Sequence, residues 1–359
     1  MYLLPKRAPF IAVVKDGGAW MLPNRPCESS GSPYVPEIEG PYQDHPEVSQ
    51  IELPFGLYSR GPTMTNAVQL ATFDQYRSLL FSIAYRMLGT VADAEDMLQE
   101  TFIRWQQAAA EEIRSPRAFL VTVISRLCIN QLESARVRRE EYVGQWLPEP
   151  VVTGVGSDPL GILKVDESLS MAFLIMLERL TAVERAVFLL REVFEYEYAE
   201  IAAILGLTEA NCRQILRRAR EHVSAARPRF AASKQEQEEL LARFLEAAGS
   251  GDMDGLLAIL ADDAVLRADG GGKALAVPNA IHGARNVARA MLSTLEKRLP
   301  KNVEPRLAQV NGEAGLVAYV EGKPFSVVTL EVAQGRVHGV YIVTNPEKLA
   351  HLPHLSQKQ

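Results

Sequence analysis

Residues 198–223 read YAEIAAILGLTEANCRQILRRAREHV, and this stretch decides the fold of the middle of the chain. A short helix carrying Ala202 is followed four residues later by Gly206, which suits a tight turn. Cys212 and Ile215 then recur at helical spacing and predict the inward face of a second helix. A small residue, a glycine turn and an inward apolar pair at this spacing are typical of a helix-turn-helix.

The second helix of this motif has a basic outer face. Thr208 caps its start, and its outward side chains are Arg213, Gln214, Arg217 and Arg218. Residues 211–230 contain six arginines and one acid, although the whole chain of 359 residues has a net charge of -6. The distribution of charge, rather than its sum, is the footprint of DNA binding, so this face predicts DNA recognition. The alternative is an ordinary helical hairpin with a solvated basic face.

The composition, 47% hydrophobic and 23% charged, is that of a soluble globular protein. There is no run of about 18 apolar residues and no signal peptide, so we expect a cytoplasmic protein without a membrane segment. Cys27, Cys128 and Cys212 lie far apart with no CxxC pair. They predict neither a disulfide framework nor a zinc site, and we expect no metal and no cofactor.

Residues 1–63 are rich in proline, glycine and serine and show no sustained periodicity. This composition predicts a disordered extension. A second methionine, Met64, stands just before the first periodic segment. We therefore expect the extension to be dispensable, or even to result from a start codon assigned upstream of the true one.

Helical signals begin after this extension. Residues 79–88 repeat apolar side chains on one helical face, and Gly89 ends the run. Capping boxes at 90–93 and 181–184 mark two further helix starts, and the Ser-Pro pair at 115–116 marks another. These signals predict helical groups on both sides of a linker.

The linker, residues 144–165, contains prolines and glycines that preclude a continuous helix. Past the helix-turn-helix the pattern changes to helices and then to alternating runs such as GLVAYVEG and FSVVTLEV. The Asn-Gly pair at 311–312 and the Gln-Gly pair at 334–335 predict hairpin turns. Helices followed by strands predict an α+β domain with an antiparallel sheet.

Together the helical groups resemble a bacterial RNA polymerase sigma factor of the extracytoplasmic-function group. FSIAYRMLGTVADAEDMLQETFIRWQ looks like the sigma-2 segment that docks on core polymerase, and SPRAFLVTVISRLCINQLESARVRREE is similar to the part that opens and reads the −10 element. LTAVERAVFLLREVFEYEYAEIAAILGLTEANCRQILRRAREHV looks like sigma-4, which reads the −35 element. The resemblance places sigma-2 at 64–143, the linker at 144–165 and sigma-4 at 166–230.

The remaining residues, 235–359, resemble the SnoaL-like cone that follows sigma-4 in one subgroup of this family. Three short motifs accompany the cone in that subgroup, and the third stands here with Glu347 in place of aspartate. The motifs are WLPEP (Trp146, Leu147, Pro148, Glu149, Pro150), DGGGK (Asp269, Gly270, Gly271, Gly272, Lys273) and NPEKL (Asn345, Pro346, Glu347, Lys348, Leu349).

The resemblance implies three sets of contact residues on the helical groups. An acidic helix would dock on the β′ clamp helices of core polymerase through Asp93, Asp96, Gln99 and Glu100, although Asp93 also suits a helix cap. Candidates for the −10 element of promoter DNA are Arg117, Arg126, Asn130, Arg136, Arg138 and Arg139. For the −35 element we expect Arg213 and Gln214 to read bases and Arg217, Arg218 and Arg220 to bind phosphate.

The same resemblance implies that the cone touches WLPEP and regulates the sigma modules in cis. A ligand-sensing pocket or a small-molecule enzyme is the alternative for the cone, with Asp262, Asp263, Asp269, His282, Tyr319 and Tyr341 as its polar groups. No pair among them has a spacing that demands catalysis, so we expect no enzyme. A repressor with a sensor tail would explain the helix-turn-helix but not the sigma-2 module.

The DGGGK stretch also invites comparison with a phosphate-binding loop. That loop needs G-x-x-x-x-G-K-[ST], but Arg267 occupies its first glycine position and Ala274 follows Lys273. Glycines also allow a backbone to approach another segment closely. We therefore predict that Asp269 and Lys273 are polar clamps around a loop that packs on WLPEP.

Overall fold

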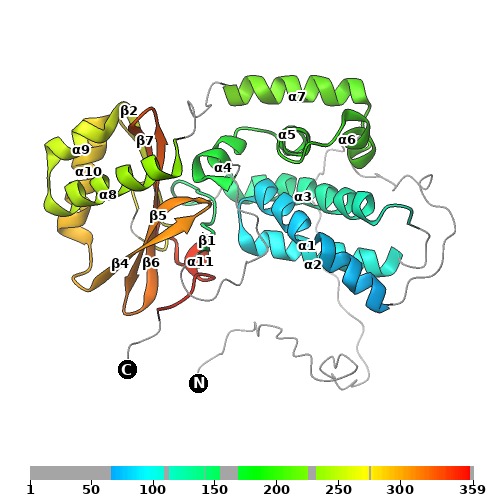
Figure 1. Ribbon diagram of the computed structural model, residues 1–359, viewed down its shortest axis with the longest axis horizontal. Coiled ribbons are helices and arrows are strands. Elements are labelled where there is room, and N and C mark those ends of the chain that lie inside the picture. The colour runs from blue at the N-terminus through cyan, green and yellow to red at the C-terminus, as the bar shows by residue number, and fades with distance from the viewer. Residues whose placement is uncertain are drawn as a thin grey trace, which may run out of the picture. The chain divides into compact units, whose positions relative to one another are not determined.

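The computed structural model describes residues 66–108, 113–140, 142–153, 169–224, 232–274 and 276–355 (Figure 1). The extension predicted at 1–63 lies outside these residues. Among the described residues, no helix is both long enough and apolar enough to cross a membrane.

The helical part consists of two consecutive groups, as predicted. The first group is α1 (Asn66–Leu88), α2 (Val91–Ala108) and α3 (Pro116–Glu140). The second group is α4 (Met171–Leu177), α5 (Ala182–Glu192), α6 (Tyr198–Leu205) and α7 (Glu209–Ser224). The capping box predicted at 181–184 is present at the start of α5.

One hydrophobic core joins the two helical groups. Its fully buried members include Leu80 of α1, Ile124 of α3 and Leu189 of α5. A buried arginine reinforces this junction, since Arg185 is only 3% exposed and its Nη1 donates to the carbonyl oxygen of Met87 at 2.6 Å. The two groups therefore pack as one unit in this structure.

The C-terminal part is a sheet with helices. Its elements are α8 (Lys234–Ser250), α9 (Met253–Ile259), β2 (Leu260–Asp269), β3 (Ile281–His282), α10 (Ala284–Arg298), β4 (Val303–Val310), β5 (Glu313–Val320), β6 (Lys323–Ala333), β7 (Arg336–Val343) and α11 (Pro346–Leu349). The strands of the described residues form one sheet in the order β1-β4-β5-β6-β7-β2-β3. The hairpin turns at 311–312 and 334–335 are confirmed, because β4–β5 and β6–β7 pair antiparallel across them.

Two features of this sheet differ from the prediction. β2 runs parallel to β7, so the sheet is mixed rather than antiparallel. β2 and β7 are neighbours in the sheet, but β3, α10 and β4–β6 separate them in the chain. Because no hairpin joins them, they can run in the same direction. In addition, β1 (Val152–Thr153) comes from the linker and pairs with β4, with Val152 opposite Val310.

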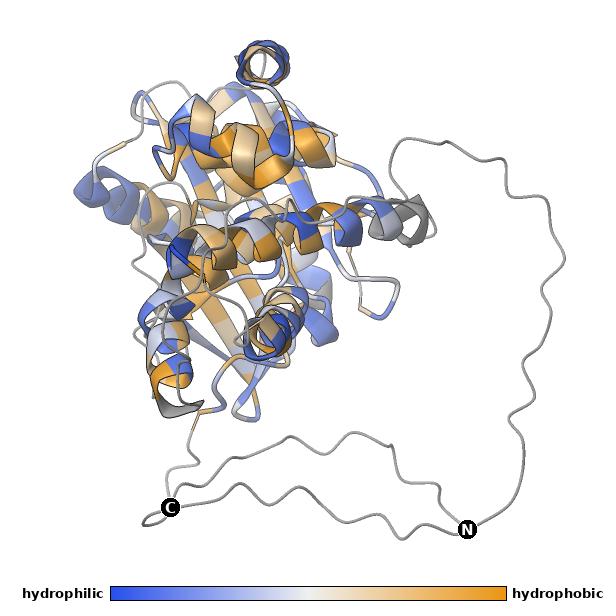
Figure 2. Ribbon diagram, turned by 90° about the vertical axis from the view of Figure 1, so that its right-hand side faces the viewer, coloured by the Kyte–Doolittle hydropathy of each residue, from blue (hydrophilic) through white to orange (hydrophobic). Residues whose placement is uncertain are grey.

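The sheet buries both faces because side chains alternate along each strand. On one face, Leu266, Leu330 and Val340 pack against α8, α9 and α10. On the other face, Val317 and Val343 pack with the linker and with α4 and α11 in a second core. Figure 2 shows hydrophobic residues where these layers meet and hydrophilic residues on the outer helix faces. The predicted fold class, two helical modules followed by an α+β cone, is confirmed.

Candidate functional site

The helix-turn-helix forms as its sequence predicts. α6 ends at Gly206, whose φ of +71° gives the left-handed conformation that closes the turn. Cys212, Leu216 and Ala219 are the buried side of α7, whereas Ile215 is only partly buried. The buried face of α7 therefore includes Cys212, as predicted, but is centred on Leu216 rather than on Ile215.

The predicted −35 contacts all lie on the exposed side of α7. These residues are Arg213, Gln214, Arg217, Arg218 and Arg220. Glu209 accepts from Arg213 at 2.7 Å, and Glu192 accepts from Arg220 at 2.6 Å. Exposed ion pairs are worth only about 0–1 kcal/mol, so these partners can be exchanged for nucleic acid at little cost.

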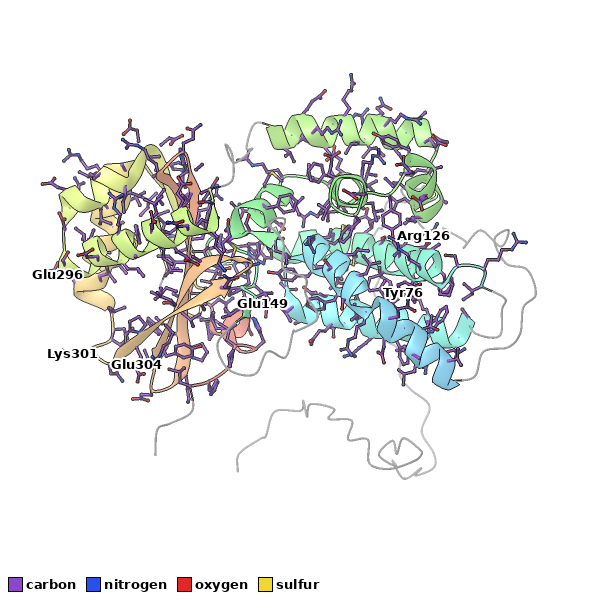
Figure 3. The ribbon with its side chains drawn as sticks, viewed as in Figure 1. Tyr76, Arg126, Glu149, Glu296, Lys301 and Glu304 are labelled. Carbon is purple, nitrogen blue, oxygen red and sulfur yellow. The ribbon has the colours of Figure 1, made fainter. Side chains whose placement is uncertain are left out.

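The predicted −10 contacts on α3 have a different environment. The guanidinium of Arg117 lies 4.9 Å from the centre of the Tyr196 ring. Nε of Arg126, which is labelled in Figure 3, donates to the carbonyl oxygen of Ile204 at 2.9 Å. Both partners belong to the second helical group. Asn130 is exposed, and the side chains of Arg136, Arg138 and Arg139 lie outside the described residues.

The predicted docking residues on α2 divide into two kinds. The Asp93 carboxylate accepts from Thr90 Oγ1 at 2.5 Å and from Gln131 Nε2 at 3.2 Å, so it ties the start of α2 to α3. The cap itself is Thr90, whose Oγ1 accepts from the Asp93 N–H at 3.3 Å. Asp96 and Gln99 are exposed, and Glu100 pairs with Arg104. Gln99 also lines a groove of about 270 Å³ between α1 and α2, with Leu70, Phe73, Asp74, Arg77, Glu95, Leu98 and Phe102.

The DGGGK loop meets the linker through Asp269, which is fully buried. Its carboxylate accepts from the backbone N–H of Leu147 at 2.8 Å and from the hydroxyl of Tyr142 at 2.6 Å. Burial, and then the bond to Asp269, hold the pKa of Tyr142 above its ordinary value, so this hydroxyl remains a donor at neutral pH. The predicted contact between this loop and WLPEP is thus present.

Lys348 of NPEKL contacts both the linker and Asp269. Nζ of Lys348 lies 2.7 Å from the Asp269 carboxylate, donates to the carbonyl oxygen of Leu147, and lies 4.2 Å from the centre of the Trp146 ring. Lys273, predicted to be a clamp, instead pairs with Glu347 at the surface. The buried cation therefore comes from NPEKL and not from DGGGK.

The loop glycines allow close approach, as predicted. Gly271 and Gly272 have φ of +59° and +67°. A Cβ on Gly272 would lie 3.0 Å from the Cβ of Val143, and one on Gly271 would overlap the side chain of Asn345. The loop thus encloses protein segments, which agrees with its failure to match a phosphate-binding loop.

WLPEP also contacts the first helical group. The Trp146 ring stands over Gly89 in the α1–α2 turn, where an added Cβ would lie 2.6 Å from Trp146 Cη2. Glu149 is 5% exposed, and its Oε2 accepts from the N–H of Val91, the first residue of α2, at 2.8 Å (Figure 3). Its Oε1 lies 2.6 Å from Nδ1 of His351. The linker therefore connects the cone to the start of α2.

A further connection had no signal in the sequence. Asn311 was predicted only as a hairpin residue, and it does adopt a φ of +52°, but its side chain is 1% exposed. Its Nδ2 donates to the Tyr85 hydroxyl at 2.7 Å, and its Oδ1 accepts from the N–H of Val151 at 3.0 Å. Tyr85 in turn donates to the carbonyl oxygen of Glu149 at 2.6 Å. Partners so distant in sequence leave no local pattern.

The polar groups considered for a catalytic cone have separate partners and do not form one site. Asp269 binds the linker, Tyr341 donates to Glu331 at 2.5 Å, and Tyr319 lies in the core between the sheet and the linker. Asp262 and His282 are exposed, and Asp263 pairs with His338 at 3.2 Å. Among the described residues, no three His, Cys, Asp or Glu side chains gather to hold a metal.

Replacing Gly89 by alanine tests the contact with Trp146. We expect Gly89→Ala to lower the free energy of unfolding by about 1–3 kcal/mol more than Gly144→Ala, because only the first collides with a packed ring. Gly144 is a matched control, since its φ is also positive but nothing lies within 4 Å of an added Cβ. Urea unfolding measures both, and equal losses would contradict the packing shown here.

Removing the buried cation tests the Asp269–Lys348 pair. Lys348→Met leaves a carboxylate buried without its counter-ion, so we expect a loss of about 3–5 kcal/mol in the free energy of unfolding. Lys273→Met removes the exposed partner of Glu347, and we expect a loss below about 1 kcal/mol. Denaturant titration of both variants checks the difference, and a Lys348→Met loss as small as that of the control would refute the buried pair.

Comparison with known proteins agrees with this arrangement. Residues 72–138 match the family model for Sigma-70 region 2, and residues 170–223 match that for Sigma-70, region 4. The ECF RNA polymerase sigma factor SigJ of Mycobacterium tuberculosis is 37% identical over 299 residues, which cover 80% of this chain and 95% of SigJ. The probable ECF RNA polymerase sigma factor SigI of the same species is 32% identical over 283 residues, covering 78% of this chain and 94% of SigI.

A crystal structure of M. tuberculosis extracytoplasmic function sigma factor SigJ is similar over most of this chain. It superposes with a TM-score of 0.65 at 35% identity and covers 78% of this chain and 98% of that chain. This share exceeds what the two helical regions contain, so the similarity continues into the SnoaL-like C-terminal domain. The chain belongs to the extracytoplasmic-function RNA polymerase sigma factors.

Proposed function

We propose that this chain binds core RNA polymerase in the cytoplasm and directs promoter-specific transcription initiation. Residues 64–143 would read and melt the −10 element, residues 166–230 would read the −35 element, and residues 235–359 would regulate both in cis. The observation that carries the proposal is the exposed arginine and glutamine face of α7 in a helix-turn-helix, within a chain of this family. Such a face has the charge and the donors that a DNA major groove requires.

The −35 contact follows from side-chain chemistry. Arginine binds guanine and glutamine binds adenine through paired hydrogen bonds in the major groove. Arg213 and Gln214 lie nearer the start of α7, which is the part of a recognition helix that meets base edges. Arg217, Arg218 and Arg220 lie further along and would bind phosphate, which positions the helix without reading sequence.

Docking on core polymerase would use the exposed side of α2. Asp96, Gln99 and Glu100 provide acceptors there for the β′ clamp helices. Asp93 supports the same surface indirectly in this proposal, because its bonds to Thr90 and Gln131 fix the start of α2. Regular, well-capped helices suit such a surface, since a rigid surface loses little conformational entropy on binding.

Reading the −10 element would require the helical groups to separate. Arg126 is partly buried and donates to the carbonyl oxygen of Ile204 in the second group, so we expect it to reach DNA only after this contact opens. Arg117 is exposed, and its stacking on Tyr196 leaves edge donors for DNA. Core polymerase would supply the binding free energy for this separation. The remaining candidates on α3, Asn130 and the arginines at 136, 138 and 139, would then join the same DNA surface.

Regulation in cis would act through the linker. Leu147 packs in the core on the cone side of the linker, Glu149 contacts His351, and β1 pairs with β4 of the cone's sheet. In this proposal the linker threads near the polymerase active site during initiation, and the cone-bound linker would first have to leave the cone. Because linker and cone share one chain, their effective concentration is high, and breaking the contact would favour the polymerase-bound state.

Replacing Arg213 tests base reading. We expect Arg213→Ala to lower run-off transcription from a cognate promoter and to relax −35 selectivity by about 1–3 kcal/mol, the discrimination of one arginine–guanine contact. Arg217→Ala should lower activity on all −35 sequences alike. Unchanged activity of Arg213→Ala across −35 variants would falsify this assignment.

Replacing Asn311 tests cis regulation. Asn311→Gly keeps the left-handed turn but removes the side-chain bonds to the Tyr85 hydroxyl and the Val151 N–H, so we expect severalfold more transcript at limiting protein concentration. Gln334→Gly is the control, because Gln334 has the same backbone conformation in an exposed hairpin turn. Run-off transcription with core polymerase compares them, and equal output from the two variants would argue against regulation through this junction.

A further inference from the structure

We infer that Tyr198 is a positioning residue for −35 recognition, which holds the guanidinium of Arg213 ready for a base edge. This inference rests on the proposed function of Arg213 and extends it to a residue on the other helix of the motif. Tyr198 is the first residue of α6, whereas Arg213 lies on α7. The tyrosine thus links the two helices at the surface that faces DNA.

The geometry places two guanidinium groups over one ring. Cζ of Arg213 lies 4.8 Å from the centre of the Tyr198 ring, and Cζ of Arg191 lies 4.9 Å from it. Arg191 is itself anchored, since its Nη1 donates to the carbonyl oxygen of Tyr196 at 2.8 Å and lies 3.1 Å from Glu197. The ring is therefore held against α5 and offers a fixed platform to Arg213.

A second contact orients the same guanidinium. Nη2 of Arg213 donates to Oε2 of Glu209, one turn earlier on α7, at 2.7 Å. The flat face of an arginine can stack on an aromatic ring while its edge donors point elsewhere. Stacking on Tyr198 therefore leaves edge N–H groups for a guanine, and Glu209 can release its donor when the base arrives.

The conformational entropy of the arginine side chain explains why such a platform matters. Immobilising a free arginine side chain costs about a thirtyfold factor in an equilibrium constant. A cation–π contact at an exposed site recovers about two- to fivefold of this, and an i,i+4 ion pair on a helix recovers at most about twofold. Part of the ordering of Arg213 is thus complete before DNA binds, although half of its side chain (55%) is exposed.

The expected consequence is selectivity rather than general affinity. Removing the ring leaves the charge of Arg213 and its attraction to phosphate unchanged. A loosely held guanidinium, however, can reach phosphates or other bases as well as the intended guanine. Tyr198 would thus affect the ratio of cognate to non-cognate binding through Arg213.

The test is run-off transcription by the full-length chain with core polymerase on promoters carrying every single-base change in the −35 element. We expect Tyr198→Leu, which keeps apolar packing, to lower the ratio of cognate to best non-cognate transcript by about two- to fivefold. Tyr198→Phe, which keeps the ring, should stay at the wild-type ratio. A uniform loss on all promoters by Tyr198→Leu would show a merely structural role and overturn the inference.

Arg213→Ala separates this inference from the function on which it rests. If Arg213→Ala relaxes selectivity while Tyr198→Leu does not, the inference fails and the proposed −35 reading stands. If Arg213→Ala changes no ratio, the −35 assignment itself fails. The double variant should be no less selective than Arg213→Ala alone, because Tyr198 acts through that arginine; a further loss of selectivity would contradict that route.

Discussion

The buried ion pair between Asp269 and Lys348 is the interaction on which the arrangement of this sigma factor depends. Both groups lie inside the protein, where an unpaired charge is strongly unfavourable. Their direct contact at 2.7 Å and the adjacent backbone of Leu147 make burial possible, because the Leu147 N–H donates to Asp269 and its carbonyl oxygen accepts from Lys348. The polar backbone of the linker and the two charges thus satisfy one another, and none can leave without exposing or orphaning the rest.

On either side of this pair, the linker contacts the cone and the first helical group. Toward the cone it becomes β1 and extends the sheet. Toward the helices it places Trp146 over Gly89 and Glu149 at the first N–H of α2. The same helix presents the exposed acceptors proposed for polymerase, so packed and hydrogen-bonded contacts run from the cone through the linker to the start of α2.

Arginines have distinct uses in the two helical groups. Arg185 is buried and structural, and Arg126 and Arg117 join the groups in this structure. The arginines of α7 lie at the surface in weak pairs, where their charge remains available. Burial thus differs among these arginines: Arg185 is buried and Arg126 is partly buried, whereas Arg117 is exposed like the arginines of α7 and joins the groups only by stacking on Tyr196.

Local patterns were sufficient to predict the helix-turn-helix, the capping boxes, the two hairpins and the two-part helical and α+β architecture. These features depend on periodicity and on residues a few positions apart, which a single sequence displays. The family resemblance identified WLPEP, DGGGK and NPEKL, but neither it nor local patterns showed that Lys348 rather than Lys273 is the buried cation, or that Asn311 binds Tyr85. The parallel β2–β7 pairing and the contacts of Arg117 and Arg126 were likewise decided by tertiary structure, because burial and hydrogen-bond partners arise only when segments distant in the chain pack together.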